Sequence, residues 1–155
     1  MIEKSNANIE LENFWPYQVV VLADQISRHT LSVVREQSGL NLSQWRVLAA
    51  VADKPGCSAA QVTSVTPMDK TIVSRAVASL IKTGLIQKSP TKLDKRSHAL
   101  TATRTGLEVY WKISKELNRK LNFSDVDRVS SETFLKIIKS YSSQMRSIHA
   151  KESES

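Results

Sequence analysis

The 155-residue sequence has little of several residue types, with one cysteine, four glycines and four prolines. A single cysteine excludes a disulfide within the chain. Four glycines provide no glycine-rich loop of the kind that cradles phosphate groups. No apolar run approaches the roughly 18 residues of a membrane span, and residues 1–12 are polar and charged, unlike a signal peptide. We therefore expect a cytoplasmic protein with no membrane partner.

Acidic residues are also scarce relative to basic ones. The chain has 15 Asp and Glu against 22 Lys and Arg, which gives a formal charge of +7 and a pI of about 9.7. Such an excess favours an anionic polymer or surface, nucleic acid above all, as the partner. With 41% hydrophobic residues, a chain of this length can bury one good core, so we expect a single domain over residues 1–155.

Helical periodicity dominates what is present. Apolar residues recur every three or four positions over residues 14–37, which predicts a helix, and Gly39 is expected to end it. The next helix carries "WRVLAAVA", with Asn41 or Ser43 as its N-cap, and the breaker segment "DKPG" at residues 53–56 ends it. Two helices are therefore expected before the middle of the chain.

Two capping patterns follow. Ser58 has a glutamine three residues later, which is a capping box for a short third helix. Thr66 with Asp69 repeats the spacing, so we expect Pro67 to be the first residue of a fourth helix that ends at Gly84. A short helix, a tight turn and a longer helix are the order of a helix-turn-helix.

The period changes after this helix. Two short extended pieces, residues 85–89 and 97–102, flank a basic segment and predict a hairpin. Thr103 then caps a long helix, and Ser130 or Ser131 starts a last one. The expected fold is mainly α with a small β-hairpin wing, a winged helix-turn-helix whose DNA-binding lobe spans residues 41–102.

The fourth helix has two different sides. Its apolar side, which we expect in the core, comprises Ile72, Val73, Ala76, Val77 and Leu80; its polar side comprises Thr71, Ser74, Arg75, Ala78 and Lys82. In a major groove Thr71 and Ser74 can bond base edges, and Arg75 can present a bidentate fork to guanine. Lys70 and Lys82 are placed to meet phosphates. The alternative is an ordinary solvated face.

The hairpin tip is cationic. It holds Lys92, Lys95 and Arg96 around one acid, Asp94. Such a tip suits the minor groove, where the negative potential is deepest and arginine fits. Asp94 is better placed to brace Arg96 than to touch DNA, because phosphates repel a carboxylate. The alternative is a turn that only adds solubility.

Three blocks in this order resemble the MarR family of transcriptional regulators. They are "LSQWRVL" at residues 42–48, "MDKTIVSRAVASLIKTGLI" at residues 68–86, and "DKRSHALTATRTG" at residues 94–106. In the last block Asp94, Arg96, Thr103 and Gly106 fit the family's wing pattern without a gap. One departure is Ala102, where the family often has leucine. The resemblance covers nearly the whole chain. It implies the winged helix-turn-helix fold that the order of helices and strands also predicts.

The resemblance implies a homodimer that binds a palindromic operator on double-stranded DNA, most often as a repressor that a small molecule releases. The residues support the dimer separately. Val20, Val21, Leu31 and Val34 give the first helix a second apolar side, and an apolar stripe runs along each of the last two helices. A monomer of this size has difficulty covering all of these surfaces. We therefore expect residues 12–38 and 103–150 to form dimerisation helices.

The resemblance also implies an effector pocket between the dimer helices and the DNA-binding lobe. Arg28, His29 and Arg46 lie on segments that would border it, and a guanidinium there can hold a carboxylate at two points. The blocks are similar to the branch that controls catabolism of aromatic acids, so the hypothesis is an aromatic or phenolic carboxylate or its thioester. The alternative is two surface cations and a packing histidine.

Rival functions remain open at this point. Cys57 could sense oxidants if exposed and acidic, although burial against the hairpin is the alternative. His29, His98 and His149 show no metal-ligand spacing, so no metal site is expected. No catalytic motif is visible, and we expect neither an enzyme nor a cofactor. A winged helix that only mediates protein contacts is the other alternative.

Overall fold

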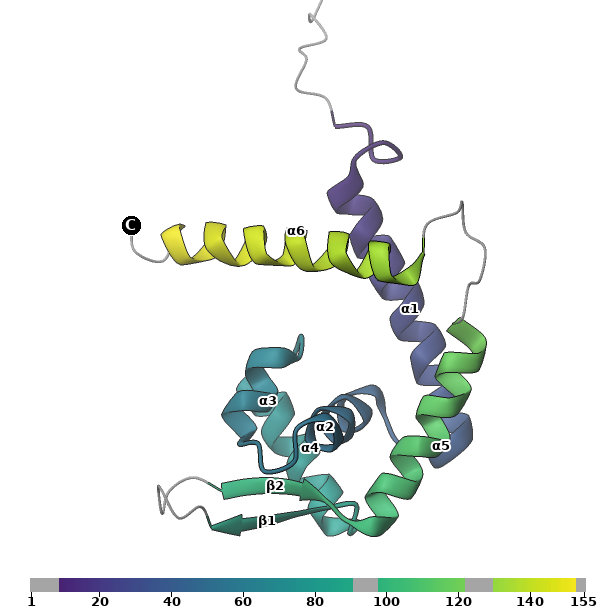
Figure 1. The fold of residues 1–155 in the computed structure, drawn as a ribbon, viewed down its shortest axis with the longest axis vertical. Coiled ribbons are helices and arrows are strands. Elements are labelled where there is room, and N and C mark those ends of the chain that lie inside the picture. Colours follow the sequence, from purple (N-terminus) through teal and green to yellow (C-terminus); the bar gives the residue numbers. More distant parts are fainter. Residues whose placement is uncertain (1–8, 91–97, 122–129, 153–155) are drawn as a thin grey trace, which may run out of the picture. The chain divides into compact units, whose positions relative to one another are not determined.

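The computed structural model describes residues 9–90, 98–121 and 130–152, which form six helices and one two-stranded sheet (Figure 1). The chain consists of two compact units, residues 1–118 and residues 119–155. None of the helices in these three ranges is long and apolar enough to cross a membrane.

The first helix, α1 (Trp15–Ser38), begins and ends close to where its sequence predicts. Pro16 lies in its first turn, where the missing N–H costs no helix hydrogen bond. Gly39 adopts a left-handed φ of 72° and donates its N–H to the carbonyl of Arg35, which ends the helix. Val33 and Val34 are its buried residues. Earlier in the helix the large apolar side chains are exposed, namely Trp15, Tyr17, Val19, Val20, Leu22 and Ile26.

Capping boxes start the next two helices. Asn41, rather than Ser43, caps α2 (Leu42–Asp53): its side chain accepts from the N–H of Gln44, whose side chain accepts in return from the N–H of Asn41. Ser58 and Gln61 form the same reciprocal pair at the start of α3 (Ala59–Val65), as predicted. Each box satisfies two backbone N–H groups that the helix itself leaves unpaired.

The start predicted for the fourth helix is wrong by three residues. The helix α4 (Lys70–Lys82) is capped by Asp69, whose carboxylate accepts from the N–H of Ile72 at 2.8 Å. Thr66 instead ends α3, and its hydroxyl donates to the carbonyl of Val62. Both residues are good N-caps, and the chain uses the second one because the first is already bonded backwards into α3. Gly84, with a φ of 70°, follows the helix as predicted.

The hairpin also forms where expected. Strands β1 (Ile86–Pro90) and β2 (His98–Ala102) pair antiparallel, with Ile86 opposite Ala102. The turn before α3 extends this sheet by one bridge, because Cys57 and Leu100 pair through their backbones. Cys57 thereby becomes part of the hairpin's base.

One core joins these elements. Helices α2, α3 and α4 pack together and against the hairpin (Figure 1). The largest fully buried side chains include Leu48, Leu80, Ile86 and Ile113. The rings of Trp45 in α2 and Tyr110 in α5 (Arg104–Leu121) stack with their centroids 5.8 Å apart. The fold class predicted from sequence is therefore confirmed: a mainly helical winged helix-turn-helix with a small hairpin.

The last helix, α6 (Ser131–Glu152), lies in the second unit. Ser130, the first of the two predicted starts, accepts the N–H of Thr133 through its hydroxyl. The large apolar residues of α6 are exposed, namely Phe134, Leu135, Ile137, Ile138, Tyr141, Met145 and Ile148.

Candidate nucleic-acid interface

The outward face of α4 carries the residues expected to meet DNA. Lys70, Thr71, Ser74, Arg75, Ala78 and Lys82 are all exposed, while Val73, Ala76 and Leu80 on the opposite side are buried. No acidic residue lies anywhere in α4, so the whole outward surface of this helix is neutral or positive. A helix of this kind has the width and the donors that a major groove admits.

One residue of α4 is not where the periodicity placed it. Ile72, which we expected in the core, is 40% exposed. The buried stripe is narrower than the apolar pattern, because it centres on Val73, Ala76 and Leu80, and Ile72 lies on the flank of that stripe. The outward surface of α4 therefore includes an apolar side chain in its first turn.

Polar contacts with other elements hold α4 in place. The amide Nε2 of Gln44 in α2 donates to the hydroxyl of Ser79 in α4 at 2.7 Å. The two residues are 35 apart in the sequence, so no local pattern pointed to this bond.

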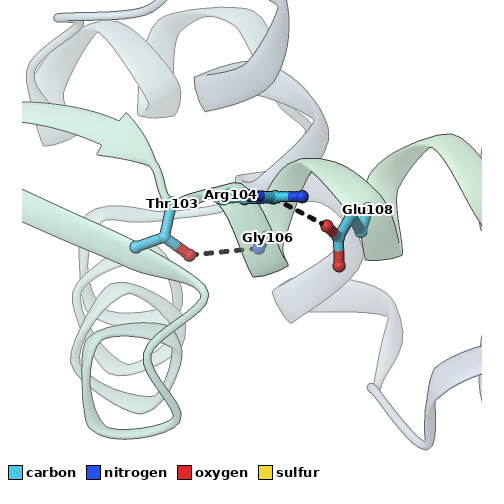
Figure 2. Close-up of polar contacts among 4 residues, drawn as sticks. All are labelled: Thr103, Arg104, Gly106 and Glu108. Carbon is cyan, nitrogen blue, oxygen red and sulfur yellow. Dashed lines mark hydrogen bonds and ion pairs between the residues drawn. The ribbon is translucent and has the colours of Figure 1, made fainter.

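The junction after the hairpin connects the winged helix-turn-helix to α5. The hydroxyl of Thr103 donates to the carbonyl of Gly84 at 2.7 Å and accepts the N–H of Gly106 at 3.1 Å, so Thr103 caps α5 as predicted (Figure 2). Its own N–H donates to the carbonyl of Leu85. Arg104 and Glu108, also in Figure 2, form an exposed ion pair one turn further on.

The wing is described only at its base. Lys92, Asp94, Lys95 and Arg96, the predicted wing contacts, lie outside the described residues. The strands that lead to them are in place, and Lys88 on β1 and His98 on β2 are exposed.

The central part of the chain matches a known protein family in sequence. The family model described as MarR family matches residues 38–97, the segment that runs from the end of α1 through α2, α3, α4 and β1. No curated protein matches the sequence.

Structural comparison extends the likeness to most of the chain. A MarR/EmrR family transcriptional regulator from Acinetobacter sp. ADP1 superposes with a TM-score of 0.74 at 21% identity, over 89% of this chain and 99% of that one. The protein has the MarR fold. The transcriptional regulator BldR from Sulfolobus solfataricus gives 0.75 at 18% identity over 84% and 93% of the two chains. A MarR protein from Peptoclostridium difficile DA00132 gives 0.71 at 23% identity over 97% and 94%.

Within this MarR fold, the three residues expected at an effector pocket have different surroundings. Arg28 is highly exposed and pairs with Asp24 on its own helix at 2.8 Å. Arg46 of α2 is partly buried and donates to the hydroxyl of Ser27 in α1 at 3.3 Å. His29 is also partly buried, and its Nε2 atom has no hydrogen-bond partner among the described residues. The structure thus separates Arg28 from the two inward-placed residues.

Cys57 is 3% exposed, in the position that the burial alternative predicted. Burial raises the pKa of its thiol above the usual 9.0, although a hydrogen bond to its own backbone and the charge of Lys54 act in the opposite direction. A protonated, buried thiol reacts slowly with oxidants, which need the thiolate. No cluster of three or more metal-ligating side chains occurs among the residues that the structure describes.

Proposed function

We propose that this protein is a transcriptional regulator that binds specific double-stranded DNA, with α4 lying in the major groove. The observation that carries the proposal is the outward face of α4, which is exposed, free of acid and rich in donors, in a chain with the MarR fold. Arg75 and the hydroxyls of Thr71 and Ser74 read base edges. Lys70 and Lys82 bind phosphates at the two ends of the helix.

The wing supplies a second contact in this proposal. Arg96, with Lys92 and Lys95, enters the adjacent minor groove, and Asp94 braces Arg96. In this proposal the hairpin of β1 and β2 presents its tip to the groove next to the one that α4 enters. The protein is not an enzyme in this proposal and uses no cofactor, and it acts in the cytoplasm.

A homodimer completes the proposed reader. The first half of α1 and one side of α6 both carry large exposed apolar side chains, and a second copy would bury them. Residues 12–38 and 103–150 are therefore the proposed dimerisation segments around the lobe of residues 41–102. Two-fold symmetry then requires a palindromic operator whose half-sites lie about 10 base pairs apart.

The test is a selection of bound duplexes from a random DNA pool at about 0.15 M salt, because phosphate-driven affinity depends steeply on salt. Wild type, Arg75→Ala and Arg28→Ala are compared. Arg28→Ala removes the same charge from an exposed position on α1 that is not among the residues proposed to contact DNA. We expect wild type and Arg28→Ala to recover the same palindrome and Arg75→Ala to lose it. Equal, sequence-independent binding by all three would overturn the proposal and leave a winged helix with a protein partner.

We further propose that a small carboxylate, in the first place an aromatic or phenolic acid or its thioester, regulates DNA binding. Two observations favour it: the guanidinium of Arg46 is partly buried and held by one long bond to Ser27, and His29 has a buried, unpaired Nε2. Arg46 is available for a two-point contact with a carboxylate. The ligand must prefer the conformation that misfits DNA, which makes the protein a repressor when its operator overlaps a promoter.

The effector proposal has its own test. Wild type, Arg46→Gln and Arg28→Gln are mixed with a panel of aromatic acids, and the melting temperature and DNA release are followed. Binding to the folded state raises the melting temperature by mass action. We expect at least one acid to raise the melting temperature and release DNA from wild type and Arg28→Gln, but not from Arg46→Gln. If no acid changes either quantity in wild type, the effector proposal is wrong.

A further inference from the structure

Gln44 lies at the meeting point of the α2 capping box and α4. Its Oε1 atom accepts the N–H of Asn41 at 2.8 Å, and its Nε2 atom donates to the hydroxyl of Ser79 at 2.7 Å. Its own N–H donates to the side chain of Asn41 at 2.9 Å. Both ends of one amide are therefore bonded, so the side chain is held in a single orientation between two helices.

The apolar contacts of α4 do not by themselves fix how far the helix is rotated about its axis. The buried stripe consists of Val73, Ala76 and Leu80, and the central residue is small. Burial of such a stripe is non-directional and tolerates a modest rotation. A hydrogen bond between side chains has a narrow range of distance and angle and does not. The bond from Gln44 to Ser79 is therefore the directional contact between α2 and α4.

Rotation of α4 matters for base reading. Ser79 lies four residues after Arg75 and is its neighbour on the helix surface. A helix with side chains has a radius of about 5 to 6 Å, so a rotation of about 10° moves a surface group by about 1 Å. Hydrogen bonds to base edges span only about 0.5 Å in length, and such a shift breaks them.

We propose that Gln44 is a positioning residue for sequence recognition: through Ser79 it sets the rotation of α4, so that Thr71, Ser74 and Arg75 meet the base edges in register. The inference rests on the proposed function, since it assumes that α4 reads DNA. Gln44 and Ser79 touch each other in this scheme and need not touch the bases.

The experiment measures affinity for the duplex selected by wild type and for a scrambled duplex, in wild type, Ser79→Ala, Ser79→Thr and Gln44→Met. Ser79→Ala removes the partner of Gln44 while leaving the capping box intact, and alanine is the best helix former. We expect it to lose about tenfold in the ratio of specific to scrambled affinity, the size of one good base contact. Its affinity for the scrambled duplex and its salt dependence stay unchanged, because the phosphate contacts are retained.

The other variants separate positioning from general stability. Ser79→Thr keeps a hydroxyl and should restore the wild-type ratio, while Gln44→Met should lose the ratio as Ser79→Ala does. The control is Ser147→Ala, which removes a hydroxyl that donates within α6. Ser147 lies off the apolar side of α6 proposed for the dimer, so this variant should behave as wild type. The proposal is overturned if Ser79→Ala keeps the wild-type ratio, if Ser79→Thr fails like Ser79→Ala, or if scrambled affinity falls equally. If wild type selects no consensus sequence, the proposed function itself is wrong, and this outcome is distinct from a failure of the positioning role.

Discussion

The carbonyl oxygen of Leu85 occupies the space that a Cβ atom at Gly106 would need. The same oxygen accepts the N–H of Thr103 at 3.0 Å, so the first turn of α5 packs directly on the backbone that leads into β1. Gly106 is buried, and its conformation is not a left-handed one, which means that the requirement for glycine comes from close approach alone. This contact connects the winged helix-turn-helix to α5.

Replacing Gly106 by alanine should therefore destabilise the fold. The methyl group would meet backbone atoms, which cannot move aside as a flexible side chain can. We expect a loss of about 1 to 3 kcal/mol or more in the free energy of unfolding, as for overpacked cores. Urea denaturation measures it, with Thr105→Ala, an exposed neighbour on the same turn, as the control. If the urea midpoint of Gly106→Ala equals that of wild type, the backbone at Leu85 moves to accommodate the methyl group and the prediction is wrong.

The N-cap of α4 offers a second prediction. Asp69→Ala removes the carboxylate that accepts the N–H of Ile72, and should lower the free energy of unfolding by about 1 kcal/mol. Asp69→Ser keeps a capping oxygen and should recover most of that loss. Thr66→Ala should not behave as a cap substitution, because its hydroxyl bonds the carbonyl of Val62. Equal losses of helix stability in Asp69→Ser and Asp69→Ala would contradict this assignment.

The buried thiol predicts indifference to oxidants. Because Cys57 is buried and burial raises its pKa, peroxide should change DNA binding equally in wild type and in Cys57→Ser. A thiol reagent should react slowly with the native protein and fast in denaturant. Release of DNA by peroxide in wild type alone would instead support the redox alternative.

The same thiol predicts how stability depends on pH. Its pKa is raised in the folded state above the usual 9.0, so the folded state holds the proton more tightly than the unfolded state. Stability from this group is fully present below pH 9 and is lost as the pH rises through the folded value. Wild type should lose stability above pH 9 more steeply than Cys57→Ala, which urea denaturation at several pH values will show. Parallel curves would contradict the shift.

The dimer proposal can be tested on α1. Leu22 is 41% exposed and lies with Val19 and Ile26 on one apolar stripe of the helix. Leu22→Glu should place a charge in the proposed interface and yield monomers, whereas Ser32→Glu, at an exposed position outside that stripe, should not. Sedimentation equilibrium distinguishes the 17.3 kDa chain from twice that mass. A wild-type protein that sediments as a monomer would refute the dimer.

Most element boundaries were predictable from sequence because the information for them is local. Asn41, Ser58 and Thr103 cap helices through bonds to residues three positions away, and Gly39 supplies its own left-handed turn. The exception shows the limit of that reasoning. Thr66 and Asp69 are both acceptable caps, and the choice between them depends on which hydroxyl or carboxylate α3 has already used.

The placement of the candidate interface was also predictable, since the polar side of α4 follows from helical period and is exposed as expected. The roles of its residues, and of the wing residues Lys92 to Arg96, stay predictions. Ile72 was misplaced because periodicity gives the direction of an apolar side but not the width of the stripe that neighbouring elements cover.

The sequence by itself thus determined the helices, most of their caps, the hairpin and the direction of the polar face of α4, which depend largely on residues close together in the chain. Tertiary structure alone decided that Gln44 donates to Ser79, that Gly106 lies against Leu85, and that the backbone of Cys57 pairs with that of Leu100. Those contacts join residues 21 or more positions apart, and they depend on how the packed helices and the hairpin bring distant backbones to within a few ångströms.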